Sequence, residues 1–176
     1  MKLKRCLSTE EKRRFFARLH ELSRGQKVTL RRCIDRRYMS LRSERILFLS
    51  LLPGGKLSDY DPTLLQSLLF VAAVFCITDR LSDKVESAEQ VLADGLLSQS
   101  SSSSGAAQRM EVILACSVSP TSQLYRSIGL VLQKAGKPVN CGRLLDDLQR
   151  WNDDEQVQQR WAMTFVEAAQ KQKEAS

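Results

Sequence analysis

The chain offers few of the residues from which most catalytic and metal sites are built. Its 176 residues contain one histidine, His20, and its five cysteines never form a Cys-x-x-Cys pair. A zinc site needs clustered thiolates or imidazoles, and a disulfide framework needs paired cysteines, so the sequence predicts neither. It also contains no Walker-type Gly-rich loop, no Gly-x-Ser-x-Gly elbow and no His-Glu-x-x-His helix. We therefore expect no enzyme activity, no cofactor and no metal.

Long hydrophobic runs are missing as well. The longest apolar stretch, Leu68 to Ile77, is about half as long as a membrane span requires. The first residues, Met1 to Ser8, lack the apolar run of a signal peptide. These observations predict a soluble, reduced, cytoplasmic protein that does not bind membranes.

Carboxylates are scarce in the first third of the chain. Residues 1–56 hold sixteen Lys or Arg and five Asp or Glu, a balance of +11, whereas the remainder holds eleven against fifteen, a balance of −4. Over residues 24–45, eight Lys or Arg are opposed only by Asp35 and Glu44. The planar guanidinium group of Arg suits phosphate oxygens, so this excess predicts that a polyanion docks near the first third. The plainer alternative is a solubilising surface.

Aromatic residues are also few, at 6% of the chain. Most of them fall on apolar stripes, which argues against a platform on which bases stack. We therefore expect contacts to sugar and phosphate without base reading, and a strong dependence of binding on salt. A second hypothesis is a helical protein–protein adaptor whose basic face binds an acidic partner.

Helix signals, in contrast, are abundant. Ser8 and Glu11 form a capping box, Asp61-Pro62 is an N-cap followed by proline, and Asn152 is the expected N-cap of the last helix. Gly25 is expected to end the first helix. Helices are predicted over about 8–23, 24–37, 43–52, 63–81, 83–97, 106–118, 122–135, 140–150 and from 152 onward. No window alternates in the manner of a strand, so the fold class is all-α.

The serine-rich segment is the best candidate boundary. It contains five successive serines and is expected to be a flexible connector. The sequence thus predicts a compact helical protein of two small bundles with about eight or nine helices. Residues 1–97 would form an N-terminal basic bundle, 98–105 a serine-rich loop, and 106–176 a C-terminal bundle.

The order of several segments resembles the CasB family, the small subunit of the type I-E CRISPR Cascade complex. The resemblance covers most of residues 12–169. The most telling pieces are the Leu-Arg-Arg step and the two Trp-containing elements. The matching segments are Gly25–Arg32, the Leu-rich stretch 46–52 before Pro53, Leu124-Tyr-Arg126 to Leu132, Val139–Leu145, and Trp151 to Trp161-Ala-Met-Thr-Phe165.

This resemblance implies a non-catalytic, all-helical protein that acts in antiviral defence. Such a subunit would pair with a second copy of itself beside the CasC backbone and the CasA large subunit. There it would support the guide RNA and the target DNA strand and help to hold the displaced, non-target strand of the R-loop. RNA-binding and DNA-binding are therefore both expected, with guide pairing supplying the sequence specificity.

Eight basic residues are the candidates for nucleic-acid contact. By family position, Arg31 and Arg32 come first, and Arg126 and Arg143 follow from their matching segments. Charge and position alone add Lys27, Arg36, Arg37 and Arg109.

Overall fold

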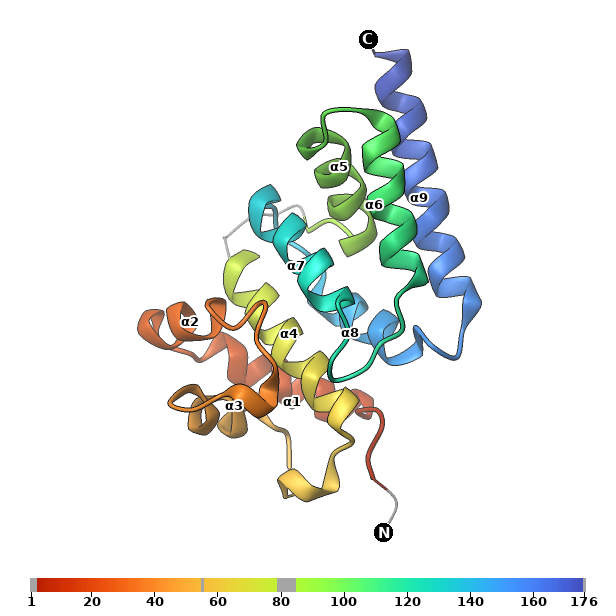
Figure 1. Cartoon of the computed structure of the whole chain (residues 1–176). Coiled ribbons are helices and arrows are strands. Elements are labelled where there is room, and N and C mark those ends of the chain that lie inside the picture. Colours follow the sequence, from red (N-terminus) through yellow and green to blue (C-terminus); the bar gives the residue numbers. More distant parts are fainter. Residues whose placement is uncertain (1–2, 55, 79–84, 176) are drawn as a thin grey trace.

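The computed structural model describes residues 3–54, 56–78 and 85–175, which fold into nine α-helices (Figure 1). These are α1 (Thr9–His20), α2 (Arg24–Arg31), α3 (Glu44–Leu51), α4 (Pro62–Thr78), α5 (Ala88–Gln99), α6 (Ser103–Ala115), α7 (Leu124–Ala135), α8 (Cys141–Arg150) and α9 (Glu155–Glu174), with short 3-10 turns η1 (Tyr38–Ser40) and η2 (Leu57–Asp59). Two isolated bridges, Lys4 with Tyr60 and Glu86 with Val139, are the β pairings in these ranges, and neither belongs to a strand. The predicted all-α class is confirmed.

Helix α4 lies at the centre because it is apolar on every side. All residues from Leu64 to Val74 are buried, and a helix that is hydrophobic all round is stable only inside a shell of other elements. Helix α2 packs on α4, and so do α7 and α8 (Figure 1). The predicted N-cap is confirmed, because the Thr63 N–H donates to Asp61 Oδ1 at 2.8 Å. The predicted continuation of this helix to Leu81, and the start of the next at Asp83, lie outside the described residues.

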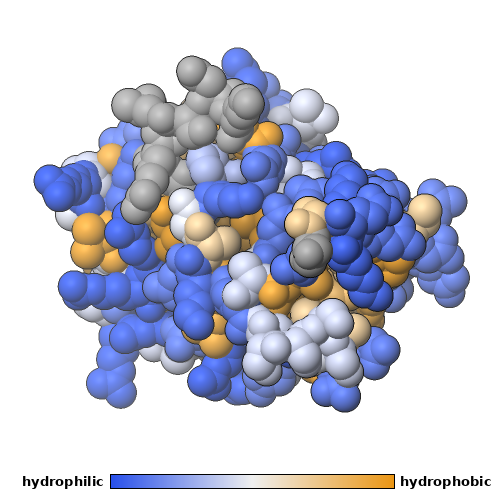
Figure 2. Space-filling view, turned by 90° about the horizontal axis from the view of Figure 1, so that it is seen from above, coloured by the Kyte–Doolittle hydropathy of each residue, from blue (hydrophilic) through white to orange (hydrophobic). Residues whose placement is uncertain are grey.

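The remaining helices lie on two sides of α4 (Figure 1). Helices α1, α2 and α3 surround one part of it, while α5, α6 and α9 pack together beyond α7 and α8 (Figure 1). A single cluster of buried hydrophobic side chains draws members from all nine described helices. Seen from above, the surface is mostly hydrophilic, with hydrophobic residues in small separate groups (Figure 2). No helix in the described ranges combines the length and hydrophobicity needed to cross a membrane.

The predicted connector over 98–105 is too long. Helix α5 continues to Gln99 and α6 begins at Ser103, because the Ser102 side chain caps α6 by accepting from the Gly105 N–H at 3.1 Å. Helix α5, which the sequence assigned to the first bundle, packs mainly against α7 and α9. The division of the chain into two bundles stays a prediction.

Two predicted capping residues are wrong, and the second helix, predicted to reach Arg37, ends at Arg31. Gly25 does not end α1; it lies in the first turn of α2, which Ser23 caps in a second capping box with Gln26. Asn152 does not cap α9, whose N-cap is Asp154. The Asn152 side chain instead pairs with the backbone of Val118, accepting from its N–H and donating to its carbonyl, both at 2.8 Å.

Candidate nucleic-acid interface

The segment from α2 to η1 directs its basic side chains outward. Leu30, Cys33 and Ile34 are buried, so one face of the segment is fixed against the core. The arginines must then occupy the remaining faces, and Arg24, Arg31, Arg32, Arg36 and Arg37 are all exposed. The excess of arginine in this stretch predicted a positively charged surface, and these side chains do lie at the surface.

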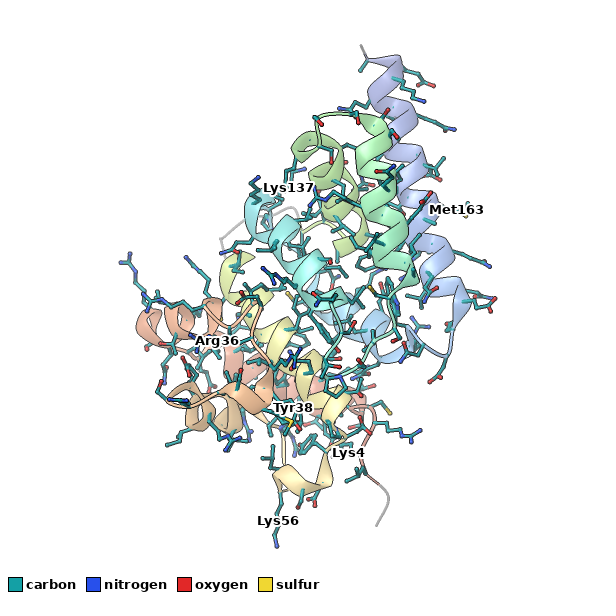
Figure 3. All side chains as sticks on the ribbon, viewed as in Figure 1. Lys4, Arg36, Tyr38, Lys56, Lys137 and Met163 are labelled. Carbon is teal, nitrogen blue, oxygen red and sulfur yellow. The ribbon has the colours of Figure 1, made fainter. Side chains whose placement is uncertain are left out.

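Gln66 of α4 fixes the backbone on both sides of Arg37. Its buried side chain donates from Nε2 to the Arg36 carbonyl at 3.0 Å and accepts at Oε1 from the Tyr38 N–H at 2.8 Å. Arg36 and Tyr38 mark this segment in Figure 3. One polar residue inside a long apolar helix gives no functional signal in the sequence, so this positioning role was missed.

Two arginines of the segment are partly engaged within the protein. The Arg31 guanidinium donates to the Cys76 carbonyl near the C-terminal end of α4, from Nη2 at 3.0 Å and from Nε at 3.3 Å. Arg36 forms an ion pair with Glu44 at 2.9 Å. The pKa of Glu44 is lowered, first by its own backbone N–H, then by the Arg42 N–H and the Arg36 charge. The positive charge of Arg36 is therefore partly compensated within the protein.

A small cavity of about 110 Å³ brings the first third of the chain against the start of α7. Arg36 and Arg37 line it on one side, and Ser122 and Arg126 line it on the other. These arginines are almost 90 residues apart in the sequence. The fold therefore joins two parts of the basic surface that the sequence could not place together.

A larger cavity of about 450 Å³ lies between α6 and α7. Arg109 of α6 and Arg126 of α7 both line it, and Arg126 also lines the smaller cavity. Arg37, Arg126 and Arg109 thus follow one another along adjoining hollows, and we call these three residues the arginine band. All three are exposed, and none forms an ion pair in the part of the chain that the structure describes. Among the described residues lining the two cavities, Asp35 is the single carboxylate.

The other candidates line neither cavity. The Lys27 ammonium group lies 5.9 Å from the centre of the Phe75 ring, and Arg31 is held on α4 as described. Arg32 is exposed at the C-terminal end of α2. Of the eight predicted contact residues, the structure therefore brings together Arg36, Arg37, Arg109 and Arg126, and leaves the rest apart.

Arg143 belongs to an ionic cluster among α5, α8 and α9. Its guanidinium pairs with Glu89, which is 3% exposed and lies 3.3 Å from Arg160 Nε. Arg160 also pairs with the fully buried Asp147, whose second oxygen accepts from Trp161 Nε1 at 2.9 Å. Replacing Arg143 with a neutral residue would leave the buried Glu89 carboxylate with one positively charged partner fewer. Arg143 therefore stabilises the fold. Nothing in its sequence spacing distinguishes it from a surface cation.

No three metal-ligating side chains gather anywhere in the described ranges. His20, the one histidine, lies in α1 with its ring edge-on to Phe75 at 4.8 Å between centres. The side chains that line the two cavities are mainly basic and polar, and guanidinium groups of this kind are suited to anionic oxygen atoms.

Comparison with known proteins agrees with the fold. The crystal structure of CasB from M. ruber superposes with a TM-score of 0.68 over 99% of each chain, at 20% sequence identity. A search of curated proteins finds no match. The sequence model of the CRISPR-associated protein Cse2 family matches residues 27–165, which is most of the chain. The resemblance to the CasB family is thereby confirmed, and the chain belongs to the CRISPR-associated Cse2 (CasB) family.

Proposed function

We propose that this protein is the non-catalytic, nucleic-acid-binding small subunit of a type I-E CRISPR Cascade complex. Family membership supports a CRISPR-associated subunit. The observation that carries the finer proposal is the arginine band, in which Arg37, Arg126 and Arg109 line adjoining cavities without carboxylate partners in the described structure. Guanidinium groups left in water without counter-charges are available for phosphate oxygens.

The expected partners follow from this role. The band would contact the sugar-phosphate backbone of the guide RNA, the target strand or the displaced strand, while base pairing with the guide supplies the sequence specificity. Within the complex the subunit would lie beside the CasC backbone and the CasA large subunit and pair with a second copy of itself. It would do so in the cytoplasm, where an R-loop forms on invading DNA.

Salt dependence gives the sharpest test. Fluorescence anisotropy would measure the affinity of the full chain for a labelled single-stranded DNA between about 50 and 200 mM salt. The slope of log K against log salt reports the number of phosphates contacted, with about 0.7 per contact on a single strand. The double variant Arg109→Ala with Arg126→Ala should therefore lower affinity and make the slope shallower by about 1.4.

The matched control removes the same charge elsewhere. Lys171 and Lys173 are exposed near the end of α9, and changing both to alanine alters the net charge equally without touching the band. An equal loss in both double variants would mean that only net charge matters, and would contradict a defined interface. Purification with native partners distinguishes nucleic-acid binding from the adaptor hypothesis. A complex that contains no RNA would favour the protein–protein adaptor.

A further inference from the structure

The walls of the cavity between α6 and α7 are not only basic. On α6, Gly105, Arg109 and Val112 fall at i, i+4 and i+7. On the opposite wall, Gln123, the N-cap of α7, is followed by Arg126 and Leu130 of α7 at i+3 and i+7. Residues at these spacings share one face of a helix. Each helix therefore turns one stripe toward the cavity, and both stripes carry a central arginine followed by an aliphatic residue.

The two aliphatic side chains are open to water. Val112 is 59% exposed and Leu130 is 46% exposed, although both line a hollow rather than a convex surface. Covering them would be favourable at about 25 cal/mol per Å² of apolar area removed from water. The cavity volume of about 450 Å³ lies in the range in which proteins hold small organic groups.

The course of the helices orders these groups along the cavity. Helices α6 and α7 run in opposite directions (Figure 1). Val112 follows Arg109 in one helix and Leu130 follows Arg126 in the other. Because the directions are opposed, the two aliphatic residues lie toward opposite ends, with the two arginines between them.

We propose that this cavity binds two successive nucleotides of an unpaired strand, with their shared phosphate between Arg109 and Arg126 and one base against each of Val112 and Leu130. This inference rests on the proposed function and names the state of the strand that the site accepts. Bases that meet an apolar wall and an arginine plane are held by their faces, which every base possesses. The site is therefore tolerant of sequence.

A duplex does not satisfy the same groups. Its bases are stacked and paired inside the helix, so it would offer phosphates to the arginines and leave both aliphatic side chains wet. An acidic protein segment would need to supply carboxylates in place of the phosphate. An unpaired strand brings the anionic link and the flanking apolar faces in one repeating unit. This proposal adds contacts to base faces to the sugar and phosphate contacts expected from the low aromatic content, and it still involves no base reading.

Abasic DNA separates the base contacts from the phosphate contacts. The full chain would be titrated with single-stranded oligothymidine and with an abasic oligonucleotide of equal length and charge. We expect the oligothymidine to bind at least about fivefold more tightly, which requires the bases to cover only about 40 Å² of apolar area at about 25 cal/mol per Å². The double variant Val112→Ser with Leu130→Ser should lose most of that advantage and should bind the abasic oligonucleotide like the unchanged protein.

The control variant replaces two exposed apolar residues that lie outside the cavity. Met163 and Val166 of α9 are 63% and 52% exposed, and Met163 projects away from α6 and α7 (Figure 3). Changing both to serine should leave both affinities unaltered. Equal binding of the two oligonucleotides by the unchanged protein, or an equal loss on both in the Val112 and Leu130 variant, would overturn the inference while leaving the phosphate interface intact. Failure of both oligonucleotides to bind in a salt-dependent way would instead overturn the proposed function.

Discussion

Replacing Asp147 with alanine should be one of the most destabilising single changes in the chain. The carboxylate is fully buried in α8, where it accepts from Trp161 Nε1 at 2.9 Å and pairs with the Arg160 guanidinium. Alanine removes both acceptor oxygens at once. The indole N–H and the inner side of the guanidinium would then remain without their partner inside the junction of α8 and α9.

The magnitude follows from these two losses. Removing one partner of a buried ion pair costs about 3–5 kcal/mol, and an unsatisfied buried donor costs about 1–3 kcal/mol. Arg160 is 35% exposed and keeps Glu89 at 3.3 Å, so its loss belongs at the low end of the first range. The low ends of the two ranges together give about 4 kcal/mol, and we expect Asp147→Ala to lower the free energy of unfolding by about that amount. Asp147→Asn keeps one acceptor oxygen and should lower it by about half as much.

Urea denaturation followed by tryptophan fluorescence would measure both values. The chain has two tryptophans, and Trp151 and Trp161 meet edge to face with ring centres 5.2 Å apart, so their emission reports this junction directly. Asp153→Ala is the matched control, because Asp153 is exposed in the connection before α9 and should change stability by less than about 0.5 kcal/mol. A loss below about 1 kcal/mol for Asp147→Ala would refute the view that this carboxylate is an essential buried partner.

Two further changes test the core and its titration. A Cβ at Gly129 would lie 2.7 Å from Ile34 Cγ1, so Gly129→Ala should lower the free energy of unfolding by about 1–3 kcal/mol in the same urea assay. A Cβ at Gly25 would have no neighbour within 4 Å, so Gly25→Ala should raise the free energy of unfolding by up to about 1 kcal/mol. A larger loss of stability in Gly25→Ala than in Gly129→Ala would contradict the packing. Burial raises the pKa of the Cys33 thiol to about 11 and that of Tyr125 to about 12. As pH rises, the unfolded chain therefore loses these protons before the folded protein does. The urea midpoint should fall between about pH 9 and 11 because of the thiol and between about pH 10 and 12 because of the phenol. An unchanged midpoint would contradict the burial of the two groups.

Features that depend on near neighbours in the chain could be predicted. The Ser8 capping box and the Asp61-Pro62 start of α4 both depend on residues within one helical turn. The wrong N-cap at Asn152 shows the limit of such patterns. Its side chain had an equally good partner in the Val118 backbone, 34 residues away, and no local rule reveals that competitor.

The site was only partly predictable for a related reason. Sequence shows how many arginines a segment carries but does not show which carbonyl or carboxylate each one meets. Arg31 and Arg37 lie in the same basic stretch, and the sequence does not distinguish them. Arg31 donates to the Cys76 carbonyl, whereas Arg37 has no ion pair in the described structure. The approach of Arg126 to Arg37 depends on how α7 packs on α4, which is a property of the whole core.

The position of the carboxylates also changes what the charge balance means. The part of the chain after residue 56 has a formal balance of −4, which on its own argues against a nucleic-acid interface there. Two of its carboxylates, Glu89 and Asp147, are buried and bound by Arg143 and Arg160, so they project little field into solvent. No carboxylate lines the cavity between α6 and α7 among the described residues. The later part of the chain can therefore present a basic face at α6 and α7 despite its negative balance, because two of its carboxylates are buried in ion pairs while Arg109 and Arg126 stay exposed beside a cavity that no described carboxylate lines.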